Sequence, residues 1–66
     1  MTKSRIDLID EIYLALEDLA NENLDGFITD EIYTRRKVQL LAIAVDNDIT
    51  KQDLDQARIR RYGVSA

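Results

Sequence analysis

Apolar residues recur at helical spacing in three stretches of this chain. Over residues 4–22 they fall at steps of three and four, with charged residues on the opposite side. The second stretch, 29–45, is amphipathic at its start and apolar nearly all round in the run LLAIAV, and the third, 50–62, has a narrower apolar face. The pattern predicts a single all-α domain over residues 1–66, with helices at 4–22, 29–45 and 50–62. We expect a helical hairpin followed by a shorter C-terminal helix.

The core is expected to draw on all three helices. Its predicted members are the apolar residues Ile12, Leu16, Leu19, Phe27, Ile28, Leu40, Leu41, Ile49 and Leu54. A helix that is apolar all round is usually buried on more than one side. The helix at 29–45 therefore lies either at the centre of the fold or at a subunit interface. We expect a homo-oligomer, a dimer, that self-associates through Ile32, Leu40, Ile43 and Val45.

The two joints between the helices resemble each other. LDGFITDEIY and VDNDITKQDL share an Asp, an Ile and a Thr at matching positions, Asp25/Asp46, Ile28/Ile49 and Thr29/Thr50. Thr29 and Thr50 are suited to accept hydrogen bonds from the first free N–H groups of the following helix. The preceding Ile can pack against that helix. We interpret the likeness as recurring capping chemistry rather than as an internal duplication.

Composition excludes several kinds of site. The chain has 66 residues with no Cys, His or Pro, so it lacks disulfides and the commonest metal ligand and acid–base group. No apolar run approaches the roughly 18 residues that span a bilayer. The remaining carboxylates lie on the solvent side of the first helix, and no Gly-rich phosphate loop is present. We expect a cytoplasmic protein with no membrane contact, no cofactor, no metal and no enzymatic activity.

Charge is distributed unevenly along the chain. Residues 1–33 carry nine acids and two bases, whereas residues 34–66 carry seven bases and four acids. The acidic half either neutralises the basic half within the fold or presents an acidic surface to a partner. In the second case the face that binds a protein partner would comprise Asp7, Asp10, Glu11, Leu14, Glu17 and Asp18. Leu14 is the one apolar residue within this acidic stripe.

Two alternatives involve nucleic acid. The acidic row of the first helix could mimic phosphates, as in an inhibitor that occupies the nucleic-acid groove of a basic partner. Alternatively, residues 40–61 can be aligned with a DNA-binding helix-turn-helix, whose candidate contact residues are Lys51, Gln52, Arg58, Arg60 and Arg61. Aspartates within its turn and recognition helix, and the net charge of −4, oppose phosphate binding. The favoured role of the arginines is to pair with the acidic first helix and with the negative end of their own helix.

The segment NENLDGFITDEI resembles a calcium-binding EF-hand loop at several of its ligand positions. Its twelfth position, which must supply a bidentate Glu, is Ile32. The segment is therefore predicted to form a tight turn at Asp25-Gly26.

Residues 12–41 resemble the SHOCT family, short helical domains usually found at the C-termini of longer bacterial proteins. The family pattern is a Leu-rich helix, then Gly, an apolar residue, Ile-Thr, acidic residues, an aromatic residue, Lys and Leu-Leu. The matching positions here are Leu16, Leu19, Gly26, Phe27, Ile28, Thr29, Asp30, Glu31, Tyr33, Lys37, Leu40 and Leu41. Ile32 departs from it, since the family tends to have Glu there. The resemblance implies a helical hairpin that mediates oligomerisation or protein contacts and has no enzymatic role.

Overall fold

The computed structural model, which describes residues 4–63, consists of three α-helices. They are α1 (Arg5–Leu24), α2 (Asp30–Asp46) and α3 (Lys51–Tyr62), and no strand occurs within the described range. The predicted all-α architecture is confirmed, and each predicted helix begins and ends within one or two residues of the observed one. None of these helices is long and apolar enough to cross a membrane.

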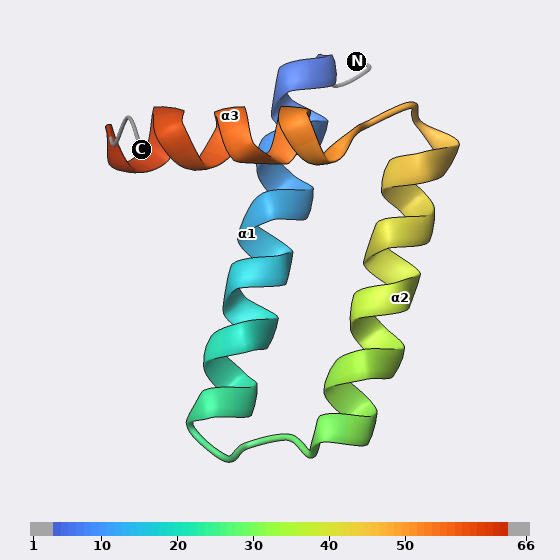
Figure 1. Cartoon of the computed structure of the whole chain (residues 1–66), viewed down its shortest axis with the longest axis vertical. Coiled ribbons are helices and arrows are strands. Elements are labelled where there is room, and N and C mark those ends of the chain that lie inside the picture. Colours follow the sequence, from blue (N-terminus) through green and yellow to red (C-terminus); the bar gives the residue numbers. More distant parts are fainter. Residues whose placement is uncertain (1–3, 64–66) are drawn as a thin grey trace.

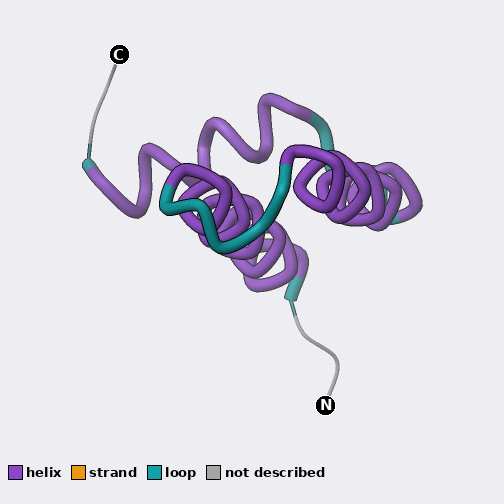
Figure 2. The backbone as a smooth tube through the Cα atoms, turned by 90° about the horizontal axis from the view of Figure 1, so that it is seen from below, coloured by secondary structure: helices purple, strands orange, loops and turns teal. Residues whose placement is uncertain are grey.

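Helix α1 holds the other two helices together. It forms an antiparallel hairpin with α2, and α3 crosses it near its N-terminal end (Figure 1). Seen along the hairpin, α3 lies on one side of the α1–α2 layer, and none of the described residues forms a helix on the other side (Figure 2). Within residues 4–63, α1 packs against both α2 and α3, whereas α2 and α3 do not pack against each other. The predicted hairpin with a shorter third helix is therefore confirmed.

The core is small and lies where α2 and α3 approach α1. Its buried residues are Ile9, Ile12, Leu19, Ala44, Ile49 and Ala57. Ile12, Leu19 and Ile49 were predicted, and the predicted Leu16 and Leu54 pack against this group while partly exposed. Ile28 and Leu40 are half-buried. The prediction is wrong for Phe27 and Leu41, whose side chains are 80% and 38% exposed.

A polar side chain caps the start of each helix. The hydroxyl oxygens of Ser4 and Thr29 accept hydrogen bonds from backbone N–H groups three residues later. At α3 the exchange is reciprocal, since the Asp53 N–H donates to Thr50 Oγ1 at 3.2 Å and the Thr50 N–H donates to Asp53 Oδ2 at 2.9 Å. The predicted caps at Thr29 and Thr50 are confirmed. They satisfy N–H groups that the helices themselves leave without partners.

The ends of α1 and α2 share one hydrogen-bonding pattern, the Schellman motif. At the end of α1 the Phe27 N–H donates to the Glu22 carbonyl at 2.9 Å, around Gly26 with φ of +81°. At the end of α2 the Ile49 N–H donates to the Ala44 carbonyl at 2.8 Å. Here the left-handed residue is Asp48, with φ of +57°.

The two joints differ by one residue, and this difference decides which apolar side chain is buried. Between the left-handed residue and the Thr cap, the second joint has only Ile49, which follows α2 and precedes α3 and is buried. The first joint has two residues there, Phe27 and Ile28. Ile28 takes the position next to the cap and is half-buried, which leaves Phe27 exposed. The prediction failed for Phe27 because the first joint is longer by one residue, a difference that the aligned sequences of the two joints do not show.

Candidate interaction surfaces

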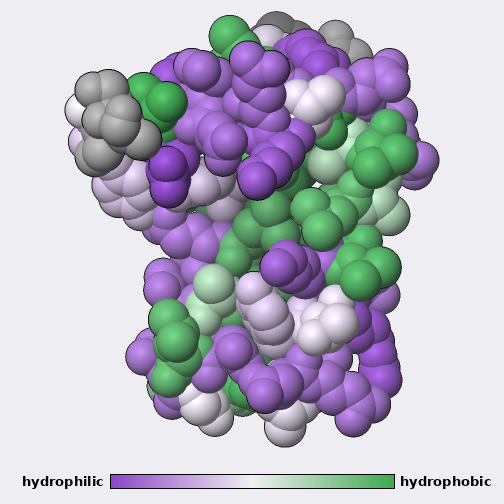
Figure 3. Space-filling model, viewed as in Figure 1, coloured by the Kyte–Doolittle hydropathy of each residue, from purple (hydrophilic) through white to green (hydrophobic). Residues whose placement is uncertain are grey.

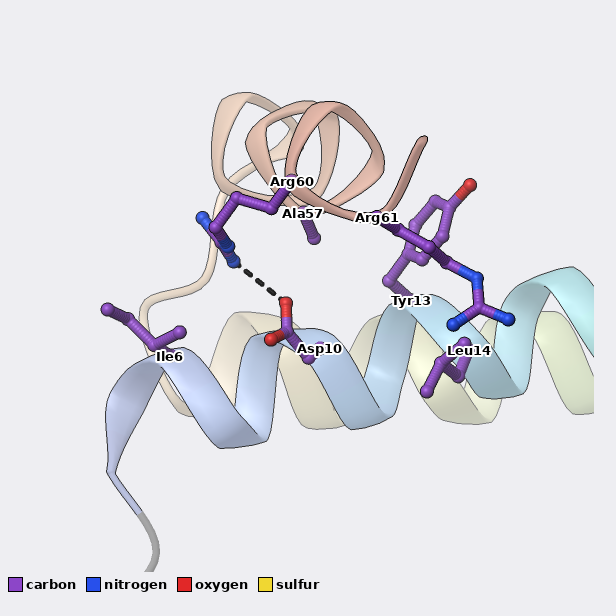
Figure 4. Close-up of a pocket in the computed structure, with 7 residues that line it drawn as sticks. All are labelled: Ile6, Asp10, Tyr13, Leu14, Ala57, Arg60 and Arg61. Carbon is purple, nitrogen blue, oxygen red and sulfur yellow. Dashed lines mark hydrogen bonds and ion pairs between the residues drawn. The ribbon is translucent and has the colours of Figure 1, made fainter. Parts of the chain in front are cut away.

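Ion pairs and a hydrogen bond hold helix α3 against the acidic side of α1. Arg60 Nη2 lies 2.8 Å from Asp10 Oδ1, and Arg61 Nε lies 3.7 Å from Glu17 Oε1. The Tyr62 hydroxyl donates to Glu17 Oε2 at 2.5 Å. The first of these ion pairs is drawn in Figure 4. The predicted pairing of the arginines with the acidic first helix is therefore confirmed for Arg60 and Arg61.

Two tyrosines and an arginine converge on Glu17 and shift its protonation. Hydrogen bonds from Tyr62 and then from Tyr13, together with the charge of Arg61, hold the pKa of Glu17 below its ordinary value. Burial, with the hydrogen bond to Glu17 and the charge of that carboxylate, raises the pKa of Tyr13 to about 12. A carboxylate held in its ionised form is a weak proton acceptor near neutral pH. This arrangement suits a structural contact between α1 and α3 better than acid–base chemistry.

Leu14, the apolar residue of the acidic stripe, borders α3. It is half-buried and lines a cavity of about 370 Å³ with Ile6, Tyr13 and Ala57. In Figure 4 the side chain of Arg61 reaches from α3 towards Leu14. Leu14 therefore lies beside the cationic end of α3, while its neighbours one helical turn away in α1, Asp10, Glu11, Glu17 and Asp18, are acidic.

The predicted partner-binding face is consequently divided. Asp10, Leu14 and Glu17 border α3. Asp7, Glu11 and Asp18 are exposed on other parts of α1. Because Asp10 and Glu17 are paired within the chain, the continuous acidic row imagined for a phosphate mimic is interrupted.

The residues considered for DNA contact are divided in the same way. Arg60 and Arg61 are engaged with α1, whereas Lys51, Gln52 and Arg58 are exposed on α3. In a helix-turn-helix the two helices that flank the turn form the binding unit. Here α3 packs against α1 instead of α2. This packing gives the helix-turn-helix alternative no support.

Arg5 makes a contact that sequence reasoning missed. Its guanidinium donates to the Asn47 carbonyl at 2.9 Å and to the Asp48 carbonyl, and it pairs with Asp53 Oδ2 at 3.2 Å. The backbone N–H of Thr50 is the largest cause, and Arg5 a smaller one, of the lowered pKa of the Asp53 carboxyl. Arg5 is the only basic residue in α1, and this feature of the sequence could have indicated that it has a partner elsewhere in the chain. It ties the start of α1 to the joint between α2 and α3.

The segment that resembles a calcium loop is partly helical. Asn21 and Asn23 lie in the last turns of α1. The Asn23 amide donates to the Ile28 carbonyl and, at 2.9 Å, to Asp30 Oδ1, which links the two ends of the turn. Within residues 4–63 no three acidic side chains come together as metal ligands.

Helix α2 buries little of its apolar surface. Ala44 is its one buried residue, and its exposed large apolar residues are Ile32, Val38, Leu41, Ile43 and Val45, at 37%, 60%, 38%, 46% and 72% exposure. Helical periodicity sorts the apolar residues into two groups on either side of Ala44. The groove-side group is Ile32, Leu40 and Ile43, and the α3-side group is Val38, Leu41 and Val45. Of the four residues predicted to self-associate, Val45 is thus separated from the other three.

Two members of the groove-side group, Leu40 and Ile43, line a groove of about 450 Å³ between α1 and α2. The lining residues are Ala15, Asp18, Leu19 and Glu22 from α1, and Arg36, Gln39, Leu40 and Ile43 from α2. On the helical wheel, those of α1 point away from the residues that meet α3, so the groove opens on the hairpin face that α3 does not cover.

The opposite face also exposes apolar surface. On the face that carries α3, hydrophobic side chains gather over the seam between α1 and α2 and along the upper part of α2 (Figure 3). Both sides of α2 therefore present apolar side chains that stay exposed among residues 4–63.

No protein-family model matches this chain, and the searches of curated proteins and of solved structures found no match. The resemblance of residues 12–41 to the SHOCT family stays a prediction.

Proposed function

We propose that this chain is a small, non-enzymatic protein-interaction module that works through the apolar sides of α2. The supporting observation is the exposure of five large apolar residues on a helix of 17 residues in which only Ala44 is buried. Contiguous apolar surface on a small domain is characteristic of a binding face. The SHOCT resemblance, which implies a role in oligomerisation or protein contacts, agrees with this proposal.

The absence of enzymatic activity in this proposal is supported by the electrostatics of the two perturbed carboxylates. The pKa values of Glu17 and Asp53 are both lowered by hydrogen bonds and neighbouring cations. A general acid needs a raised pKa, and paired catalytic carboxylates need environments that separate their pKa values. The ionised carboxylates of Glu17 and Asp53 instead stabilise the contacts between α3 and α1.

In-cell photocross-linking tests the proposal. A photoreactive residue would replace Ile43 or Val45, one from each side of α2, and the matched control would be the exposed Gln56 on α3. Irradiation of cells of the native host should give discrete covalent adducts from position 43, position 45 or both, and none from position 56. If neither α2 position gives an adduct while the protein is present and folded, the proposed function is wrong.

A further inference from the structure

We propose that the groove between α1 and α2 is occupied by the same groove of a second copy of this chain. This inference rests on the proposed function and names the partner. The product is a two-fold symmetric dimer in which two hairpins form an antiparallel four-helix bundle, a common arrangement for hairpins with one apolar face.

The shape of the hairpin permits this packing. By the helical positions of its lining residues, the groove opens on the side of the hairpin away from α3. Figure 2 shows α3 on the other side of the α1–α2 layer, so α3 does not stand between two hairpins that meet at this groove. Along its floor lie Ala15 and Leu19 of α1, and Leu40 and Ile43 of α2. Leu19 is already buried, whereas Leu40 is half-buried and Ile43 is 46% exposed. A second copy would cover the exposed parts of these side chains with their own counterparts.

The surface area of the chain also suits a dimer. A compact monomer of 7.6 kDa is expected to expose about 4,300 Å² by the usual scaling of surface with mass. This chain exposes 5118 Å². The difference, roughly 800 Å², equals the area that each partner contributes to a stable interface of standard size.

Charges at the groove select one of the two ways in which hairpins can stack. On the α1 side the groove is bordered by Asp18 and Glu22, and on the α2 side by Arg36. Within one chain, Arg36 Nη1 lies 3.9 Å from Glu22 Oε2 across the groove. The basic and acidic charges are therefore at the same height along the hairpin. Stacking α1 on the partner's α1 would place acid against acid. Stacking α1 on the partner's α2 places Asp18 near Arg36 of the partner subunit, and two-fold symmetry repeats this pair.

Sedimentation equilibrium of the purified full chain tests the dimer. The wild-type chain should sediment as a dimer at high micromolar concentration and dissociate on dilution. Ile43→Asp, on the floor of the groove, should be monomeric at the same concentrations. The matched control is Val45→Asp, which introduces the same charge on the other side of α2 and should leave the dimer intact. Circular dichroism of each variant separates loss of association from loss of folding.

A charge exchange tests the stacking. Asp18→Arg should weaken the dimer about tenfold, since two symmetric rim pairs become repulsive. Adding Arg36→Asp should restore most of the affinity, because the exchanged charges again face opposite signs. If Arg36→Asp instead weakens the dimer further, α1 does not stack on the partner's α2.

A wild-type chain that remains monomeric at millimolar concentration overturns the dimer, and so does an Ile43→Asp variant that still dimerises. These results are distinguishable from failure of the proposed function. A monomeric chain that nevertheless cross-links through α2 to another protein in cells would overturn the dimer alone. The absence of any adduct from α2 would overturn both.

Discussion

The Tyr62 hydroxyl lies 2.5 Å from a carboxylate oxygen of Glu17, so the last residue of α3 is joined to the middle of α1. Arg61 and Tyr13 also interact with this carboxylate. Glu17 therefore has to be ionised for the α1–α3 contact to reach its full strength, and the contact depends on pH.

Acid is expected to weaken the fold through Glu17 and Asp53. Their pKa values lie below the ordinary 4.5 and 3.8 in the folded state. Because a lowered folded-state pKa means that the unfolded chain binds protons more readily, this contribution is complete above the ordinary values. It is lost as the pH falls through the lowered ones. Urea unfolding measured from pH 7 to pH 3 should show this loss of stability. In Glu17→Gln the free energy of unfolding should fall less steeply as the pH decreases. If Glu17→Gln loses as much stability in acid as the unaltered chain, the role of Glu17 is contradicted. The control is Asp55→Asn, which removes an exposed carboxylate and should leave the pH dependence unchanged.

Alkaline conditions act on the same contact through Tyr13. Its pKa of about 12 exceeds the ordinary 10.0, so the unfolded chain loses this proton first. The stability that Tyr13 contributes is therefore complete below pH 10 and is lost as the pH rises towards 12. The ultraviolet absorbance of tyrosinate should contain a component that titrates near pH 12 and disappears in Tyr13→Phe. A variant that retains this late component would show that another tyrosine carries it.

The second joint can be improved by a single substitution. Asp48 has a φ of +57°, a left-handed conformation that disfavours residues with a side chain. Asp48→Gly keeps its backbone carbonyl available to Arg5 and removes this strain. We expect the free energy of unfolding to rise by about 0.5–1 kcal/mol, measured by urea denaturation.

The first joint gives the converse prediction. Gly26, with φ of +81°, has no atom within 4 Å of the place where a Cβ would lie, so only the backbone opposes a side chain there. Gly26→Ala should therefore lower the free energy of unfolding by about 1 kcal/mol. A neutral effect would mean that the turn has relaxed out of the left-handed conformation, which the chemical shifts of residue 26 would reveal.

Ala57 controls how closely α3 approaches α1. It is 2% exposed and belongs to the shared core. Ala57→Leu should overpack this contact and lower stability by about 1–3 kcal/mol. By contrast, Phe27→Ser should change stability by less than about 0.5 kcal/mol, because the Phe27 side chain is 80% exposed. Thermal unfolding of the two variants compares a small buried residue with a large exposed one. A larger loss for Phe27→Ser would place that side chain in the core.

The helices and their caps could be predicted from sequence because they depend on residues close together in the chain. Thr29 and Thr50 bond to N–H groups only three residues away, and apolar spacing defines each helix. The exposure of Phe27 could not be predicted in this way, because it depends on a joint that is longer by one residue. Neither could the contacts of Arg5, since its partners are backbone carbonyls more than forty positions away.

The acidic stripe shows a second limit of sequence reasoning. Helical periodicity placed Asp10, Glu17 and Asp18 on one side of the first helix. It could not decide whether a partner or the chain itself would neutralise them. The path of α3 decides this for Asp10 and Glu17, which meet Arg60 and Arg61, while Asp18 remains at the open groove.

The position of α1 between two helices that do not pack against each other has a consequence for the order of folding. Helices α1 and α2 are neighbours in the chain and can pair as soon as both have been synthesised. The polar contacts between α3 and the acidic side of α1 join residues 44 to 50 positions apart and include the last residue of α3. Closing so long a loop costs more conformational entropy and follows the local pairing. We therefore expect the hairpin of α1 and α2 to form before Arg60 and Arg61 pair with the acidic side of α1.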